Sequence, residues 1–273
     1  FRKYMEEKFK KNLSKKEILD FINNYLYVED NAANSIYEYF KEQYLYAKIP
    51  NENKILVEFY YDEYLDKKYV IFHSLYGRRV NNVLSRAIAF IIAKLQHIDV
   101  EISVTDNGFY LSSNKKIQVL RAFKLLKSEN LRKILEQSIE DGEILKRRFR
   151  HCAARSLMIL REYKGNKRRV GRQQVSSMIL MSAVKRISNN FPILKEARRE
   201  VLEDFMDIRN AELVLKDIEK NKIKIEEIST EIPSPFAFNL ILEGYTDIMK
   251  IDDKIEFVKR MHNKVLAKIS LKK

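Results

Sequence analysis

Side chains that alternate in character between residues 54 and 113 constrain the fold more than any other feature. Residues 55–61 place Ile, Val, Phe and Tyr at every second position, and successive side chains of a strand point to opposite faces of a sheet. Similar strand patterns return at 69–72, 100–104 and 109–111. An apolar helical pattern at 80–95 follows Gly77, and it separates the second strand from the third. We therefore predict a small mixed sheet with one crossover helix.

The rest of the chain has mainly helical patterns. Ser14 and Glu17 fit a capping box before a helix, within a helical segment that covers 1–48. Further helices are predicted at 117–127, 129–140, 143–163, 170–189, 193–206 and 252–269, with a late strand at 222–226. The predicted fold is α+β and predominantly helical: an N-terminal helical pair, a small mixed sheet with a crossover helix, and a multi-helix C-terminal bundle. We expect segments 1–50, 51–115 and 116–273 to form one domain together.

Composition narrows the class of protein. Hydrophobic residues make up 45% and charged residues 33% of the 273 residues, which is typical of globular chains and not of disordered ones. The longest apolar run, 87–93, is far shorter than the roughly 20 residues that span a bilayer. Cys152 is the single cysteine, so no internal disulfide is possible, and we expect a cytoplasmic protein without membrane contact. Because the chain opens on Phe1 rather than methionine, we expect it to be a piece of a longer polypeptide.

A net charge of +14 favours a polyanionic partner, since charge of one sign promotes association with the other. The densest basic stretch is 146–172, in which Glu162 is the single acidic residue. Guanidinium groups suit phosphates because they donate two parallel hydrogen bonds. The candidate phosphate contacts here are Arg147, Arg150, Arg155, Lys167, Arg168, Arg169 and Arg172. The start of a helix near Val170 adds free backbone N–H groups, and Gln173 could reach a base edge or cap the helix. The alternative is a solvated basic face.

Two further candidates carry weaker signals. Arg78, Arg79 and Arg86 lie where a strand turns through Gly77 into a helix, and they suit a nucleic-acid backbone or a purely structural turn equally. Phe236 follows the extended segment 233–235, where an aromatic ring could stack on a base. Packing in the core is the competing interpretation for Phe236.

The search for catalytic motifs is negative. The sequence has no G-x-x-x-x-G-K-[ST] phosphate loop, no acidic helicase box and no H-E-x-x-H motif, which are the usual signs of nucleotide or zinc chemistry. The four histidines share no metal-ligand spacing. By composition and motif alone, the chain is a basic α+β module without a visible catalytic constellation.

Eight strings in order resemble one family. They are YVIFHSLYGRRVN at 69–81, VTDNGF at 104–109, RFRHCAAR at 148–155, RQQ at 172–174, FPILKE at 191–196, REVLED at 199–204, PSPFAFN at 233–239 and EGYTD at 243–247. Together they are similar to the C-terminal region of the large helicase-related (Lhr) superfamily 2 helicases, in the branch typical of archaea. The resemblance covers most of the chain.

The resemblance implies a role as an accessory region of an ATP-driven 3′-to-5′ translocase. Such a protein has two RecA-like motor domains and a winged helix, which this chain lacks, so ATP and Mg²⁺ are expected only in those missing domains and no cofactor is expected here. The expected partners are single-stranded or partly duplex DNA, or an RNA–DNA hybrid, and the motor and winged-helix domains of the same polypeptide. The family's aromatic platform against DNA cannot be placed on a residue, since the chain has no tryptophan.

Three hypotheses follow. The chain clamps the tracking single strand through arginine–phosphate contacts, or its arginines only brace the domain and its interface with the motors. A third hypothesis is a base-excision or nuclease activity, for which the sequence offers no clear carboxylate or histidine constellation.

Overall fold

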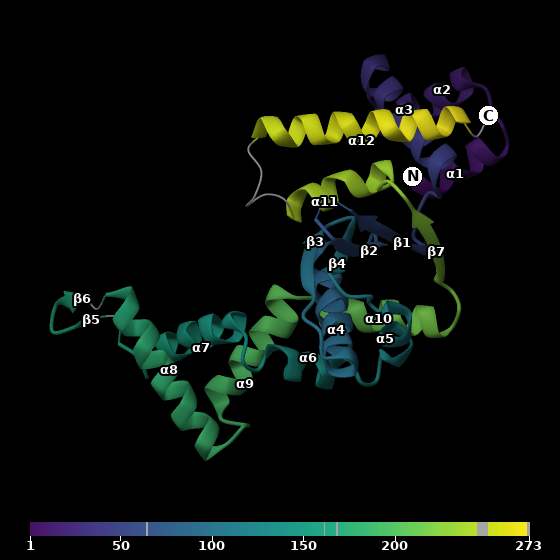
Figure 1. Cartoon of the computed structure of the whole chain (residues 1–273). Helices are drawn as coiled ribbons and strands as arrows, with labels where there is room; N and C mark the ends of the chain where they lie inside the picture. Colours follow the sequence, from purple (N-terminus) through teal and green to yellow (C-terminus); the bar gives the residue numbers. More distant parts are fainter. Residues whose placement is uncertain (64, 161, 168, 245–250, 272–273) are drawn as a thin grey trace.

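A five-stranded mixed sheet lies at the centre of the computed structural model, which describes residues 1–63, 65–160, 162–167, 169–244 and 251–271 (Figure 1). The strands are β1 (Lys54–Asp62), β2 (Lys67–His73), β3 (Glu101–Thr105), β4 (Gly108–Ser113) and β7 (Lys224–Thr230). Their order is β3-β4-β2-β1-β7, with β7 parallel to β1 and the other neighbours antiparallel. The predicted mixed sheet is confirmed, and its late strand joins the edge of β1.

Both faces of the sheet are buried, because its alternating residues are apolar on each side. Val57 and Phe72 belong to the larger core cluster, together with Phe109 of β4. Their sequence neighbours Ile71 and Tyr110 point the other way into a second cluster. A sheet covered on both faces requires a layer of helices on each side.

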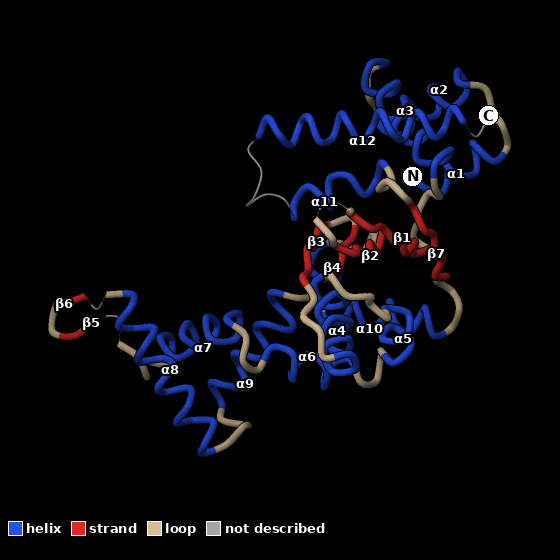
Figure 2. The backbone as a smooth tube through the Cα atoms, in the orientation of Figure 1, coloured by secondary structure: helices blue, strands red, loops and turns tan. Residues whose placement is uncertain are grey.

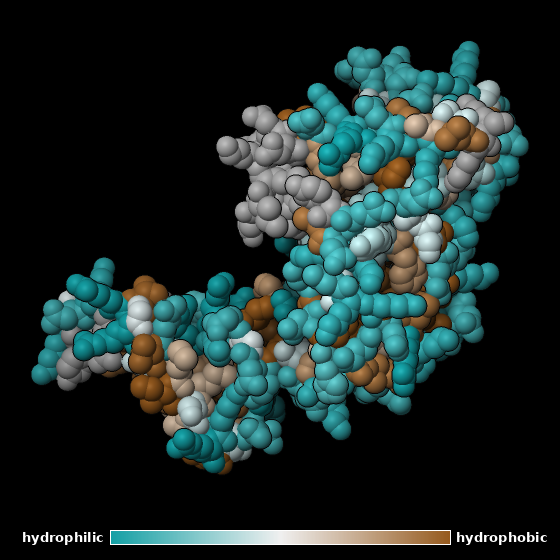
Figure 3. Space-filling view, viewed as in Figure 1, coloured by the Kyte–Doolittle hydropathy of each residue, from teal (hydrophilic) through white to brown (hydrophobic). Residues whose placement is uncertain are grey.

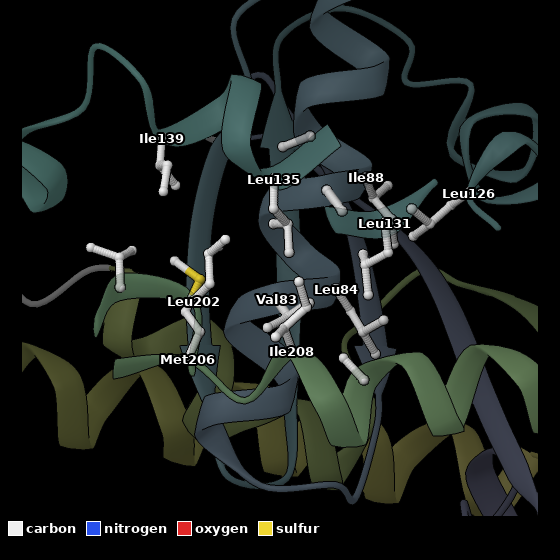
Figure 4. Packing of buried hydrophobic residues seen from close by; sticks show 14 of the residues in the cluster. Val83, Leu84, Ile88, Leu126, Leu131, Leu135, Ile139, Leu202, Met206 and Ile208 are labelled. Carbon is white, nitrogen blue, oxygen red and sulfur yellow. The ribbon is translucent and has the colours of Figure 1, made fainter. Parts of the chain in front are cut away.

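The first face is covered by the crossover helix α4 (Arg78–Gln96), which follows β2 and precedes β3 in the sequence. It packs with α5 (Val119–Leu125), α6 (Leu131–Ile139) and α10 (Ile208–Glu219). Figure 4 shows Val83 of α4, Leu135 of α6 and Ile208 of α10 converging in this core. On the second face lie the 3₁₀ turn η2 (Pro235–Ala237), α11 (Phe238–Gly244) and α12 (Ile251–Leu271).

The N-terminal helices form a separate small core beside α12. They are α1 (Arg2–Lys10), α2 (Lys15–Leu26) and α3 (Asp30–Tyr46). The capping box at the start of α2 is confirmed: the Ser14 side chain accepts from the backbone of Glu17, whose carboxylate accepts from Ser14 N at 2.8 Å. Met5, Ile18 and Ile22 are fully buried between these helices.

An arm projects from the body of the molecule (Figures 1 and 2). We define it as residues 143–199. Its elements are α7 (Glu143–Arg155), the short hairpin of β5 (Glu162–Tyr163) and β6 (Asn166–Lys167), α8 (Val170–Ile187) and α9 (Pro192–Arg199). A π-helical segment, η1 (Glu200–Phe205), leads from α9 back into the body.

The predicted helix at 143–163 is too long. Helix α7 ends at Arg155, and Leu157 has a left-handed φ of 59° that breaks the helix. The hairpin then turns through Lys164 and Gly165, whose φ angles are 50° and 76°, as a two-residue type I′ turn requires. Leu160 and Tyr163 continue the apolar spacing of α7 by coincidence of sequence, so periodicity alone could not show where the helix stops.

A group of polar contacts joins the loop before α4, residues 74–77, to the turn between β3 and β4, residues 106–107. The buried Asn81 side chain donates to Ser74 O at 2.9 Å and to Thr105 O at 2.9 Å. Asp106 accepts from the backbone N–H of Arg78 at 3.1 Å, at the N-terminus of α4. The strings at 69–81 and 104–109 therefore meet in space, and their polar residues hold a strand–helix turn against a hairpin turn.

Among the described residues, no helix is long and apolar enough to cross a bilayer.

We expect Gly108→Ala to destabilise the protein. A Cβ at position 108 would lie 2.3 Å from the backbone oxygen of Phe72, so β2 and β4 would have to separate locally. Overpacking of this kind costs about 1–3 kcal/mol, measurable by urea unfolding. Gly171→Ala is the matched control, because nothing lies within 4 Å of its Cβ, and a change there should stay within about 0.5 kcal/mol. Equal stability of the two variants would contradict the close approach of the strands.

Candidate nucleic-acid interface

The outer face of α7 carries two of the predicted phosphate contacts. Leu145 and Phe149 are fully buried on the inner face, whereas Arg147 is exposed and Arg150 half-buried on the opposite side. Neither arginine forms an ion pair with any part of the chain that the structure describes. Their guanidinium groups are therefore available to an anion.

Arg155 has a different environment. Its guanidinium pairs with Glu200 of η1 and lies 3.4 Å from the Cys152 sulfur. Glu200 is only 5% exposed, and Arg148 contributes a second, longer contact of 3.8 Å to its carboxylate. A buried carboxylate needs such partners. The basic stretch thus divides into arginines that hold the base of the arm together and arginines that face solvent.

The cysteine beside this ion pair is a packing residue. Burial, followed by the neighbouring Glu200 carboxylate, raises the pKa of the Cys152 thiol to about 11. The thiol therefore stays protonated at neutral pH, whereas the reactive form of a cysteine is the thiolate.

The hairpin and the start of α8 bring three further cations together. Lys167, Arg169 and Arg172 are exposed, and none of the three pairs with a described residue. Helix α8 has no side-chain N-cap and no acidic residue in its first turn. Cations at a helix N-terminus oppose the helix dipole, and a bound anion relieves this repulsion. Gln173 is half-buried and already interacts within the chain, while Arg168 lies outside the described residues.

The predicted phosphate contacts Arg78, Arg79 and Arg86 at the start of α4 have mainly structural roles. Arg79 donates to the backbone oxygens of Glu203 at 2.7 Å and Met206 at 3.1 Å, so it caps the end of the π-helical segment. Arg86 donates to the Asn82 side chain at 2.7 Å, and burial lowers its pKa. Only the Arg78 side chain faces solvent without such a partner among described residues.

Phe236 is packed between the N-terminal helices and the sheet. Its ring centroid lies 4.7 Å from that of Tyr39 and 5.1 Å from that of Phe40, and the Arg2 guanidinium stacks 4.6 Å from it. Its backbone N–H donates to Gln43 at 3.0 Å. These contacts favour the core-packing interpretation over base stacking.

Sequence reasoning missed a buried Glu–His–Ser cluster. Glu58 of β1 is fully buried, and His73 Nε2 donates to it at 2.8 Å. The Ser234 hydroxyl and backbone N–H donate to the same carboxylate at 2.6 and 2.7 Å, and Thr230 adds a fourth hydrogen bond at 2.8 Å. Nucleophilic catalysis needs the serine to bond to the histidine. Here both bond to the acid, so the cluster is structural, and its members lie too far apart in sequence for any motif to reveal it.

One surface cleft is also an unsuitable ligand site. It has a volume of about 660 Å³ between α6, α9 and η1. Most of its charged side chains form ion pairs: Arg132 lies 3.0 Å from Glu203, and Arg199 lies 2.8 Å from Glu196. Among the residues with described positions, no group of three or more His, Cys, Asp or Glu side chains could hold a metal ion.

Comparisons with known proteins agree with this architecture. The profile of the family described as DEAD/H associated matches residues 49–237, which include the sheet, the arm and the π-helical segment. The chain belongs to the DEAD/H-associated family. The strings at 69–81 and 104–109, which meet in one junction of the fold, both lie within the matched residues.

Relatives of this DEAD/H-associated chain are helicases. It is 53% identical over 269 residues to the ATP-dependent helicase Lhr-Core of Methanothermobacter thermautotrophicus, covering 98% of the chain and 31% of that protein. The Saccharolobus solfataricus protein of the same name is 41% identical, with 97% and 31% covered. A structure of Mycobacterium smegmatis helicase Lhr bound to ssDNA and AMP-PNP matches with a TM-score of 0.73 at 26% identity, covering 87% of this chain and 30% of that one. The chain therefore spans about a third of the length of these relatives.

We expect Glu58 to make stability depend on acidic pH. Burial alone raises the pKa of the Glu58 carboxyl, but hydrogen bonds from His73 and Ser234 and the attraction of His73 lower it by more. A lowered folded-state pKa gives stability that is fully present above the ordinary glutamate pKa and is lost as the pH falls through the folded value. Glu58→Gln should lower the free energy of unfolding at neutral pH by on the order of 3 kcal/mol. In urea titrations, the difference between the two proteins should shrink towards acidic pH, and a constant difference would contradict this assignment.

We expect the two classes of arginine in the arm to differ in stability measurements. Arg155→Ala leaves the buried Glu200 carboxylate without its nearest partner, which costs about 1–3 kcal/mol. Arg147→Ala removes an exposed, unpaired side chain and should change stability by no more than about 0.5 kcal/mol. Thermal unfolding of both variants tests this, and equal effects would refute the division of the basic stretch.

Proposed function

We propose that this chain is an accessory nucleic-acid-binding region of an ATP-dependent 3′-to-5′ DNA helicase. In this proposal the arm holds the tracking single strand by its phosphates. The contacts are Arg147 and Arg150 on α7 and Lys167, Arg169 and Arg172 at the start of α8, with Arg168 expected beside them. Arg155 braces the arm from within.

The observation that carries the proposal is the set of solvent-facing guanidinium groups on the arm. Between 147 and 172, Glu162 is the single acidic residue, so neighbouring carboxylates do not neutralise these cations. By contrast, the cations near the surface cleft, such as Arg132 of α6 and Arg199 of α9, already pair with carboxylates. A projecting element with unneutralised arginines suits a phosphate backbone, whose recognition depends on charge and little on sequence.

The relatives support the nucleic-acid partner and the motor. The M. smegmatis relative is a helicase bound to single-stranded DNA and AMP-PNP. Because this sequence contains no phosphate-binding loop, we propose that ATP and Mg²⁺ bind in motor domains elsewhere in a longer polypeptide. RNA–DNA hybrid or partly duplex substrates are compatible with the same phosphate contacts, since these do not read bases.

A bracing role is the second candidate, and specific contacts favour it for part of the set. Arg79, Arg155 and Arg198 hold backbone oxygens or carboxylates within the chain. If all basic residues had only this role, the chain would bind single strands no better than a control protein of equal charge.

Replacing three arm arginines should weaken binding to single-stranded DNA. We expect the variant Arg147→Ala, Arg150→Ala, Arg169→Ala to lose roughly tenfold to a hundredfold in affinity, and its slope of log K against log salt should fall by about 2, at ~0.7 for each lost phosphate contact. The loss should be equal for oligonucleotides of different sequence. Fluorescence anisotropy at several salt concentrations measures both quantities.

The matched control removes the same charge from the body. Arg121, Lys124 and Lys127 are exposed near α5 and have no side-chain partner among the described residues. If their replacement by alanine reduced binding as much as the arm variant, net charge and not the arm would account for the affinity.

A further inference from the structure

Helix α8 is apolar on two opposite faces, and only one of them is covered. Its inner face, with Met181 and Val184, is buried where α8 packs on α7 and α9. On the outer face, Val175 is 58% exposed, Met178 55% and Ile179 66%. Positions i, i+3 and i+4 form one continuous stripe on a helix. A helix that is apolar on both faces normally has partners on both.

Exposed apolar residues concentrate on the arm. Eight of the 23 large hydrophobic side chains that are exposed among the described residues lie within 157–187. Single exposed apolar residues are ordinary, whereas a contiguous patch marks an interaction surface. Brown apolar residues show between the teal polar ones on the arm in Figure 3. Among these eight residues, Val175, Met178 and Ile179 form the outer stripe of α8.

Charge argues against a second copy of the chain as the occupant. Arg172 and Arg186 lie on the same face as the stripe, near its two ends, about 21 Å apart at 1.5 Å per residue. Antiparallel pairing of two α8 helices about Ile179 would place Arg172 opposite Arg186 of the second copy. Parallel pairing would place each arginine opposite its equivalent. Both arrangements bring like charges together, which is unfavourable at an interface.

We propose that the outer face of α8, formed by Val175, Met178, Ile179 and Arg186, docks on the remaining part of a longer polypeptide of the relatives' kind. The occupant is an apolar patch with a carboxylate opposite Arg186. Its source is consistent with the relatives' length, because this chain covers 31% of the M. thermautotrophicus protein and 30% of the M. smegmatis helicase. Arg172, at the other end of the same face, is one of the proposed phosphate contacts and is left out of the docking face. The docking face does not rest on those contacts.

A single thiol tests whether the face is covered. Met178→Cys places a reactive group on the stripe, and the native Cys152 is buried with a raised pKa, so it is slow to react. The maleimide labelling rate is measured by mass spectrometry of the peptide that carries position 178. It is compared between the 273-residue chain and the same chain built into the M. thermautotrophicus relative in place of the matching segment. Rates in urea correct for intrinsic reactivity, and circular dichroism confirms that the variant folds.

We expect labelling to slow by about tenfold or more in the long polypeptide. The reason is that position 178 can react only while the face is uncovered, which for a docked face is less than about a tenth of the time. Arg186→Glu in the long polypeptide should restore fast labelling, because it opposes the carboxylate of the occupant. Equal rates in both proteins would overturn the proposal. So would slowing in the isolated chain as its concentration rises, which indicates a second copy, or on addition of an oligonucleotide, which indicates nucleic acid. The comparison between the isolated chain and the long polypeptide is made without nucleic acid, so its failure would leave the phosphate proposal to be tested by its own binding measurement.

Discussion

The carboxylate of Glu58 connects parts of the chain that are far apart in sequence. Taking a carboxylate out of water costs several kcal/mol unless its oxygens are satisfied. Four donors from His73, Thr230 and Ser234 satisfy this one. Strands β1 and β2, the end of β7 and the segment that enters η2 therefore meet at one point. The second helical layer begins at this point, so the position of α11 and α12 over the sheet depends on the same carboxylate.

Local patterns predicted much of the sheet and the helices. Alternation located β1 and β2, and it also located β3 and β4, which pair as a hairpin through a turn at 106–107. The capping box located α2. These signals are local, because neighbouring residues alone determine strand alternation, turn geometry and helix caps. The position of β7 beside β1 is a contact between distant segments, and the alternation of β7 could show that it is a strand but not which strand it joins.

In the candidate site, too, the sequence predicted features that depend on neighbouring residues but not contacts between residues far apart in the chain. The sequence located the basic stretch and the helix start at Val170. It could not separate Arg155 from Arg147, because the difference lies in Glu200, 45 residues away. The sequence pattern also predicted a helix over 143–163, whereas α7 ends at Arg155, Leu157 is left-handed and a hairpin begins at Glu162. Phe236 was ambiguous for a similar reason, since its neighbours Tyr39 and Phe40 come from α3.

The π-helical segment η1 connects the arm to the body of the molecule. It begins with Glu200, which holds Arg155 of α7, and Arg79 of the body caps its end at Glu203 and Met206. Interruptions of this type are rare in helices and frequent at functional sites. Residues at both ends of η1 thus fix the direction in which the arm leaves the body. The solvent-facing arginines of α7 and the apolar outer stripe of α8 both lie on the arm that η1 attaches, and Arg198 of the arm also pairs with Glu140 of the body. An arm held at its base by ion pairs can therefore present a phosphate-binding side and a docking side in a constant relation to each other, which a flexible basic tail could not do.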